Sequence, residues 1–210
     1  MLAIAYLPAV AEPAAALVVF AGPDGAMSAG AQAADAATKG AVQAAAKAAR
    51  FEGGVGEIVE LLAPAGLPHS RLLLVGTGPA DKVDASVAER VGGAIAARLL
   101  LSGETTASVD VTGVLAGDLA AHVGHGAVLR SWRFDQYRTT QKEKQKPTLT
   151  SLAIIGAGDV AAHDRLMAIA GGVARTRTLV SEPPNVIYPE SFVESARDLA
   201  ALGVELTVLD

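Results

Sequence analysis

The chain has 210 residues, 51% of them hydrophobic, and a formal net charge of −5 at pH 7. This length suits one large domain, or one domain and part of another, with a sizeable buried core. The mild charge gives no general attraction to nucleic acid, no apolar run reaches the ~20 residues of a membrane span, and the absence of cysteine excludes disulfides, thiolate metal sites and a cysteine nucleophile.

The N-terminal segment contains two short apolar runs, which are interrupted by Pro8, Glu12 and Pro13. No basic segment precedes them, so we interpret the runs as strands and not as a signal peptide. We therefore expect a cytoplasmic protein that has no contact with a membrane.

Further along the chain, short apolar runs alternate with longer, alanine-rich segments. The runs predict buried strands, and apolar residues at helical spacing, such as Val83, Val87 and Val91, predict helices. The predicted strands are 2–7, 15–21, 56–63, 70–78, 107–114, 150–156 and 204–210. The predicted helices are 28–51 (broken at Gly40), 80–103, 117–134, 159–182 and 189–203. This order predicts an α/β fold with a mixed, largely parallel sheet and helices on both faces.

One turn resembles a dinucleotide-binding fingerprint. Gly156, Gly158 and Ala161 match G-x-G-x-x-A after a predicted strand. The fingerprint also needs a strand that ends in an acidic residue about 20 residues later, whereas Asp210 lies 54 residues after Gly156. We therefore favour a tight strand-to-helix turn. The turn at 75–81 is a poorer match because Asp81 takes the third small position.

Two histidines, His122 and His125, lie three positions apart and would share one face of a helix, as metal ligands can. The sequence places no third ligand near them, so we favour a pair on a surface helix. His69 and His163 stand alone near element ends and receive no role, and no G-x-S-x-G motif is present. We assign no catalytic, cofactor-binding or metal-binding residue in this chain.

The segment 130–146 carries six basic and two acidic residues and includes Trp132, Phe134 and Tyr137. Nucleic-acid surfaces combine these residue types. The pattern also fits a helix end with inward-facing aromatic side chains followed by a solvated loop, which we favour. We expect Trp132 and at least one of the other two aromatic residues to pack against the sheet.

The segment 179–192 contains two consecutive prolines, which end the preceding helix near Ser181. Pro189 suits the first turn of the next helix. Because the strong strand pattern at 204–210 has no following partner, we expect a rigid joint here and, after it, the beginning of a second domain.

At this joint the sequence resembles the cytosol leucyl aminopeptidases. Their interdomain helix leads into a segment of the type ARDLVNEPPNVLTPEYF and then GVEVEVLD, and residues 174–210 match both, with Ser181 where Asn is usual. Two earlier family patterns recur in the same order, F-x-G-x-x-G-E and a stretch of the type SYRFDRYKTKK. They are carried by Phe51, Gly53, Gly56 and Glu57 and by Arg133, Phe134, Asp135 and Tyr137.

The resemblance implies a macro-domain-like N-terminal domain (1–158), an interdomain helix (159–182) and the start of a truncated catalytic domain (183–210). It also implies a hexameric enzyme that removes N-terminal residues from peptides. Two divalent metal ions, manganese or zinc, are held in the catalytic domain by a Lys and by carboxylates that include those of an N-T-D-A-E-G-R-L motif. That motif does not occur here, so we expect this chain to be inactive by itself and to have the catalytic domain as its partner.

Two alternatives from other functional classes stay open. A macro-like domain could bind ADP-ribose or another nucleotide through the turns at 75–81 or 156–162. The basic segment 130–146 could bind DNA.

Overall fold

The computed structural model describes residues 1–9, 14–156 and 158–209, which form two compact units, Met1–Ala170 and Gly171–Asp210. The predicted strand at 15–21 follows the first gap, and Ala157 of the glycine turn and the terminal Asp210 lie outside the described residues. Within the described part of the chain, no helix combines the length and the apolar character needed to cross a bilayer.

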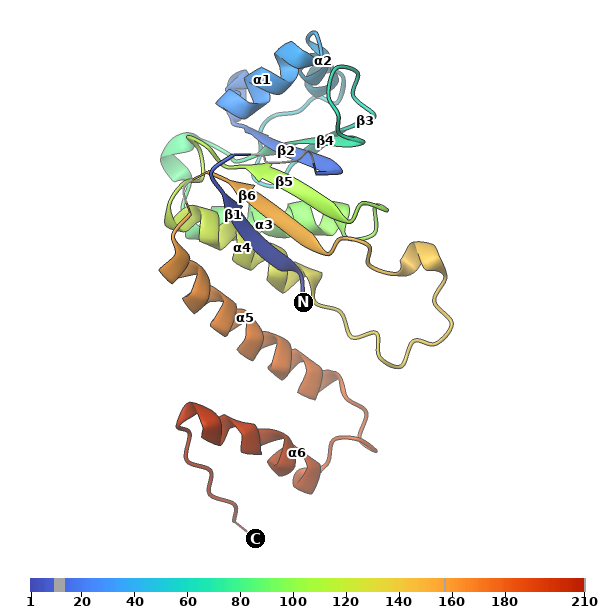
Figure 1. Ribbon diagram of the computed structural model, residues 1–210, viewed down its shortest axis with the longest axis vertical. Coiled ribbons are helices and arrows are strands. Elements are labelled where there is room, and N and C mark those ends of the chain that lie inside the picture. The colour runs from blue at the N-terminus through green and yellow to red at the C-terminus, as the bar shows by residue number, and fades with distance from the viewer. Residues whose placement is uncertain (10–13, 157, 210) are drawn as a thin grey trace. The chain divides into compact units, whose positions relative to one another are not determined.

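The first unit is built on a six-stranded sheet with the order β1-β6-β5-β2-β4-β3 (Figure 1). Every neighbouring pair is parallel except β3 and β4, which are antiparallel. The strands are β1 (Ala3–Leu7), β2 (Ala16–Ala21), β3 (Ile58–Leu62), β4 (Arg71–Gly76), β5 (Thr106–Asp110) and β6 (Ser151–Ile155). The predicted mixed, largely parallel sheet is confirmed.

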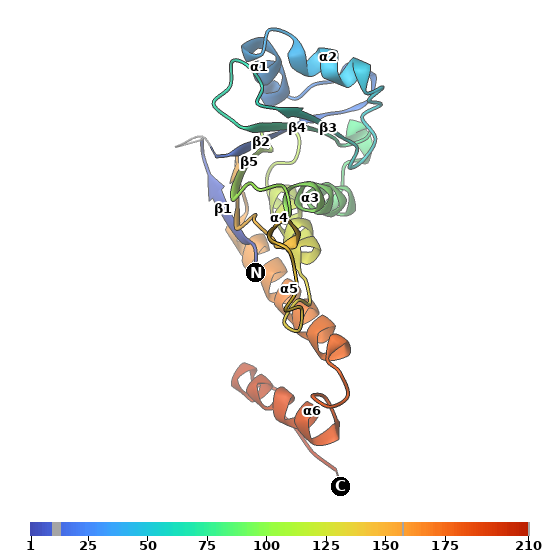
Figure 2. The ribbon, with the colours of Figure 1, turned by 90° about the vertical axis from the view of Figure 1, so that its right-hand side faces the viewer.

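Helices cover both faces of the sheet, as predicted. Figure 2 shows α1 (Ala29–Ala37) and α2 (Ala41–Ala48) on one face and α3 (Ala85–Leu99) and α4 (Asp118–Ser131) on the other. Side chains of a strand alternate between the faces. Val18 and Phe20 in β2 therefore belong to the core under α3 and α4, whereas Val19 and Ala21 belong to the core under α1 and α2.

Local signals explain where the helices begin. The predicted break at Gly40 is confirmed: this residue has φ 86°, a left-handed conformation that glycine adopts without a steric penalty, and it separates α1 from α2. Helix α3 begins later than predicted because Asp84 caps it, accepting a hydrogen bond from the Val87 amide at 2.8 Å. Residues 80–82 form a separate 3₁₀ turn, η2 (Ala80–Lys82).

Helices α3 and α4 approach each other through glycine. A Cβ atom at Gly92 would lie 2.8 Å from the carbonyl carbon of Val123, and one at Gly126 would lie 2.6 Å from the carbonyl carbon of Glu89. No side-chain rotation relieves such a clash, because the opposing atoms belong to the backbone. The two glycines therefore determine how closely these helices pack.

Helix α5 (Val160–Ser181) begins within the first unit, where Ala162 and Leu166 pack against Ala121 of α4. The Tyr6 hydroxyl lies 3.2 Å from Nδ1 of His163, and the two rings meet edge to face. Burial raises the pKa of Tyr6 to about 12. These contacts join the start of α5 to the edge strand β1.

The second unit contains the remainder of α5, then α6 (Pro189–Ala196) and the 3₁₀ segment η4 (Arg197–Leu202). Pro189 occupies the first turn of α6, as predicted. Arg175 forms a two-pronged ion pair with Asp198, with N–O distances of 2.7 and 2.8 Å. This pair joins α5 to η4 within the unit.

The predicted strand at 204–210 is wrong for residues 204–209, which have no regular secondary structure. Its apolar side chains are exposed, with Leu209 88% accessible. An apolar pattern forms a strand only beside another strand that supplies hydrogen bonds, and the described part of this unit holds none. The predicted division at 158 and 182 stays a prediction; along the chain, the boundary between the two compact units falls after Ala170, in α5.

Candidate functional site

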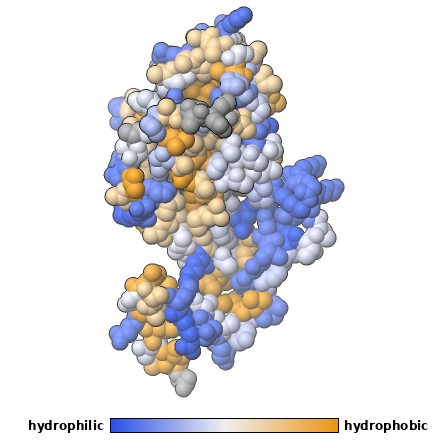
Figure 3. Space-filling model, viewed as in Figure 1, coloured by the Kyte–Doolittle hydropathy of each residue, from blue (hydrophilic) through white to orange (hydrophobic). Residues whose placement is uncertain are grey.

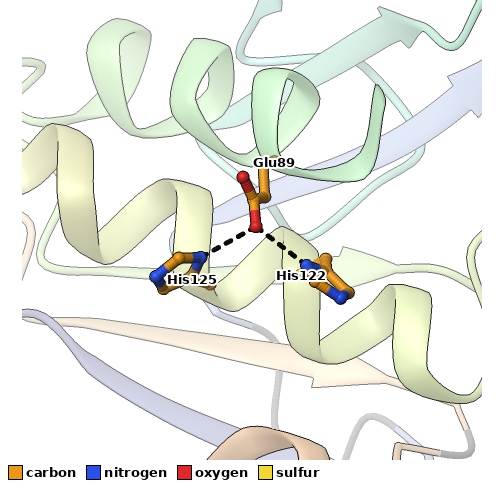
Figure 4. Close-up of side chains that lie close together, drawn as sticks. All are labelled: Glu89, His122 and His125. Atoms are coloured by element: carbon orange, nitrogen blue, oxygen red, sulfur yellow. Dashed lines mark hydrogen bonds and ion pairs between the residues drawn. The ribbon is translucent and has the colours of Figure 1, made fainter. Parts of the chain in front are cut away.

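Three potential metal-ligating side chains meet between α3 and α4 (Figure 4). Oε1 of Glu89, from α3, lies 2.8 Å from Nδ1 of His122 and 2.9 Å from Nδ1 of His125, both from α4. A carboxylate can only accept hydrogen bonds, so both rings carry a proton on Nδ1 and donate it to the same oxygen. The second oxygen of Glu89 takes no part in these two hydrogen bonds.

The cluster has a buried side and an accessible side. The side chain of His125 is 7% exposed and that of His122 is 14% exposed, whereas that of Glu89 is 35% exposed. Burial by itself raises the pKa of Glu89, but hydrogen bonds and electrostatic attraction from the two histidines outweigh this effect, and its pKa lies below the usual range. Glu89 is therefore ionised near neutral pH.

One buried atom of the cluster is unsatisfied. Nε2 of His125 has no hydrogen-bond partner among the described residues. A buried polar atom without a partner costs free energy. The hydrogen bonds of the cluster therefore leave one buried nitrogen of this ring unpaired.

The backbone explains why these three side chains meet. Residues three apart on a helix share one face, so His122 and His125 both face α3. Gly126 follows His125 directly and lies against the backbone of Glu89. The close helix crossing therefore brings the Glu89 carboxylate to the two imidazoles.

The interpretation of the two histidines as a pair on a surface helix is wrong for His125, which is buried. Sequence reasoning also missed Glu89, because 33 residues separate it from His122. The signal that could have indicated it is the glycine content of both helices, Gly92 and Gly93 in one and Gly124 and Gly126 in the other. Two imidazoles and a carboxylate can hold a divalent transition-metal ion.

The other two histidines have local structural roles. Nδ1 of His69 lies 2.8 Å from the carbonyl oxygen of Ala14, and His163 pairs with Tyr6. Neither belongs to a group of three potential ligands among the described residues.

A crevice of about 800 Å³ lies where β2, β4 and β5 end. The chain leaves β2 towards one side of the sheet and β5 towards the other, and such switch points are common ligand sites in α/β proteins. The turn at 75–81 contributes Thr77, Gly78, Pro79 and Ala80. No lysine or arginine is among the described residues of the lining, and Asp24 is acidic. This charge does not favour a pyrophosphate.

The glycine turn at 156–162 has a packing explanation. A Cβ at Gly158 would clash with the Tyr6 ring, lying 2.9 Å from both its Cγ and its Cε1 and closer still to its Cδ1, so this position must stay small because an aromatic ring covers it. None of its described residues lines the crevice. The turn therefore does not join the turn at 75–81 in one nucleotide site.

Helix α4 ends at Ser131, three residues before the predicted end at 134, so Trp132 and Phe134 lie beyond its last residue. Trp132 and Phe134 are half-buried and stack with their ring centroids 6.4 Å apart, whereas Tyr137 is 52% exposed. Trp132 lines a depression beside the buried Leu2 and Leu149. Trp132 and Phe134 therefore use part of their surface for packing within the protein.

Charge pairing in this segment also limits a nucleic-acid surface. Asp135 forms ion pairs with Arg133 and Arg138 at 2.6 and 3.6 Å. The segment between α4 and β6 loops away from the sheet in Figure 1 and is mainly hydrophilic in Figure 3. A solvated loop is thus the better description of most of it.

The model of the "Cytosol aminopeptidase family, N-terminal domain" matches residues 18–141. The chain belongs to the cytosol aminopeptidase family. This match covers the crevice, the Glu89–His122–His125 cluster and most of the sheet.

Curated members of the cytosol aminopeptidase family align with 80% to 99% of the chain. A probable cytosol aminopeptidase of Caulobacter vibrioides is 36% identical over 200 residues, which cover 93% of this chain and 40% of that protein. The corresponding protein of Bradyrhizobium is 36% identical over 216 residues, covering 99% of this chain and 42% of that protein. The chain thus spans about two fifths of these relatives' length.

Solved structures support the same fold. A tomato leucine aminopeptidase mutant superposes with a TM-score of 0.78 at 24% identity, over 96% of this chain and 42% of that one. The bottromycin maturation enzyme BotP, in a complex with Mn, superposes with a TM-score of 0.67 at 22% identity, over 90% of this chain and 36% of that one.

Proposed function

We propose that this chain is the N-terminal, assembly and regulatory portion of a leucyl aminopeptidase and carries none of that enzyme's catalytic residues. The observation that supports this most is the coverage of two relatives named probable cytosol aminopeptidases: their alignments cover 93% and 99% of this chain but only 40% and 42% of their own length. The remaining three fifths of those proteins have no counterpart in these residues.

The whole enzyme would release N-terminal amino acids from peptides in the cytoplasm. Its C-terminal domain would hold two divalent ions, zinc or manganese, which polarise the peptide carbonyl and supply hydroxide. Among the described residues here, the only group of three potential ligands is Glu89, His122 and His125. Three ligands suit one ion and not a two-metal centre, which supports placing catalysis elsewhere.

The role of this chain would be structural. We propose a macro-like domain at 1–158, an interdomain helix at 159–182 and the start of the catalytic domain at 183–210. The domain would associate with its own catalytic domain and take part in a hexamer. Exposed apolar residues at 204–209 and Phe192 in α6 are the kind of surface that such an association would bury.

The test is hydrolysis of leucine p-nitroanilide by the purified 210-residue chain with added Mn²⁺ or Zn²⁺. We expect no turnover above a buffer control. Metal-dependent turnover that stays with the protein through successive purification steps would overturn the proposal. Calorimetric titration with ADP-ribose and a salt-dependent DNA mobility shift test the two alternative functions on the same sample, and saturable binding in either would favour that alternative.

A further inference from the structure

We propose that Glu89, His122 and His125 form a binding site for one Zn²⁺ ion, which links α3 to α4 and is separate from any peptidase chemistry. The site lies within the residues matched by the N-terminal family model, so it does not depend on a catalytic domain. Zn²⁺ would be bound through Nδ1 of each imidazole and one oxygen of Glu89, with water in the fourth position.

The chemistry of the three ligands fits zinc. Imidazole nitrogen and carboxylate oxygen are both zinc ligands, and three protein ligands with one water complete a four-coordinate site. The three ligand atoms lie within 4.8 Å of one another. Glu89 supplies a carboxylate, and its side chain is one-third exposed, so the site has a group that attracts a cation and a side from which water can enter.

The carboxylate of Glu89 needs only a small movement. Zn–N and Zn–O bonds of roughly 2.0–2.1 Å in a tetrahedral site place ligand atoms roughly 3.3 Å apart. The present N–O separations are 2.8 and 2.9 Å, so the carboxylate must move away by about half an ångström. Rotation of the partly exposed Glu89 side chain can supply this movement, and the two imidazole nitrogens, which lie within 4.8 Å of each other, need the same spacing of roughly 3.3 Å.

The protons can be accounted for. Each imidazole donates a proton from Nδ1 to Glu89, and a ring that binds metal through Nδ1 carries a proton on Nε2 only. The metal thus replaces the two hydrogen bonds that Glu89 accepts. A ring protonated on Nδ1 alone shifts its proton to Nε2, and a ring protonated on both nitrogens releases one proton to solvent. Nε2 of His125 has no partner among the described residues and gains none when Nδ1 binds metal, so this atom does not distinguish the two arrangements.

The alternative is a cluster held by hydrogen bonds alone, and two substitutions at one position separate the two cases. His122→Gln retains a side-chain N–H that can donate to Glu89 but supplies a poor zinc ligand. His122→Cys gives up that hydrogen bond and supplies a thiolate, which is a strong zinc ligand. His163→Gln is the matched control, because it removes a histidine that lies outside the cluster.

The experiment uses the tag-free chain, freed of metal with a chelator and titrated with Zn²⁺ by calorimetry. We expect one ion per chain, and at saturation a rise of about 5–10 °C in melting temperature. His122→Gln and Glu89→Gln should weaken binding by at least the ~10–100-fold that loss of a hydrogen-bond partner of a metal ligand causes. His163→Gln should bind like the wild type.

Co²⁺ provides a second readout that does not depend on stability. The wild type should give the intense visible bands of a four-coordinate site, and His122→Cys should retain them and add a thiolate charge-transfer band. The proposal is overturned if the wild type binds no ion at one-to-one stoichiometry. It is also overturned if His122→Gln binds zinc as tightly as the wild type, or if His122→Cys shows no thiolate band.

Discussion

The close crossing of α3 and α4 makes one substitution especially informative. Gly92→Ala adds a single methyl group in α3, which would lie 2.8 Å from the carbonyl carbon of Val123 and 3.1 Å from the amide nitrogen of Ala127. Ordinary van der Waals contact begins at 3.4 Å. Because both opposing atoms are backbone, the helices must separate by more than half an ångström, and the side chains packed between them lose contact.

Two opposing terms determine the size of the effect. Overpacking a well-packed interior costs about 1–3 kcal/mol, and a clash with rigid backbone belongs at the upper end of that range. Alanine gains about 1 kcal/mol over glycine in helix propensity. We therefore expect a net destabilisation of about 2 kcal/mol, equivalent to a fall in melting temperature of about 4–8 °C for a chain of this size.

The next residue provides the matched control. A Cβ at Gly93 would lie 3.7 Å from the Gly126 carbonyl oxygen, an ordinary contact, so Gly93→Ala should gain helix propensity and become more stable by up to about 1 kcal/mol. Thermal and urea unfolding of both variants measure the difference. If Gly92→Ala is as stable as the wild type, or if the two variants lose stability equally, the described helix crossing is incorrect.

Three further predictions concern a helix cap, an aromatic cluster and an ion pair. Asp84→Ala removes the cap of α3 and should cost about 1 kcal/mol in urea unfolding, whereas Asp84→Asn should retain most of the stability; equal losses would contradict the capping role. Trp132→Ala should lower stability by about 2 kcal/mol, less than the ~3–5 kcal/mol of a fully buried aromatic residue, because Trp132 is half-buried and stacked on a neighbouring ring; an unchanged melting temperature together with weaker DNA binding would support the nucleic-acid alternative. Burial by itself raises the pKa of Glu60, but hydrogen bonds and attraction from Arg71 and Arg98 outweigh it and hold the pKa below its usual 4.5. The ionised form therefore stabilises the fold above the unfolded pKa, and this contribution is lost as the pH falls through the folded pKa. Glu60→Gln should be less stable than the wild type near pH 7, and the gap in unfolding free energy should narrow in acid; a gap that does not depend on pH would refute this.

The sequence predicts the elements of the first unit well because each depends on local patterns. Continuous apolar runs mark strands buried on both faces, and Gly40 marks the break between α1 and α2 because its left-handed backbone needs glycine. The order of strands and helices then restricts the fold to a largely parallel sheet. Only the ends of elements shift, as at Asp84, where a side-chain cap outweighs the apolar periodicity.

Features that depend on distant contacts are not predicted. Glu89 reaches His122 and His125 only because Gly92 and Gly126 let two helices approach at one particular register, and no local pattern specifies that register. The apolar alternation at 204–209 does not form a strand either, since strand formation requires a neighbouring strand to share hydrogen bonds. Both errors arise where structure depends on a partner that the local sequence does not identify.

The most direct test of the central claim is a chimera in which this chain replaces the matched N-terminal two fifths of the Caulobacter vibrioides relative. The intact relative and its C-terminal part alone serve as controls, assayed with leucine p-nitroanilide and by size-exclusion chromatography. If this chain is the N-terminal portion of such an enzyme, the chimera should hydrolyse the substrate and elute at the size of the intact relative. A folded chimera that is no more active than the C-terminal part alone, and that elutes as a monomer, would contradict the account.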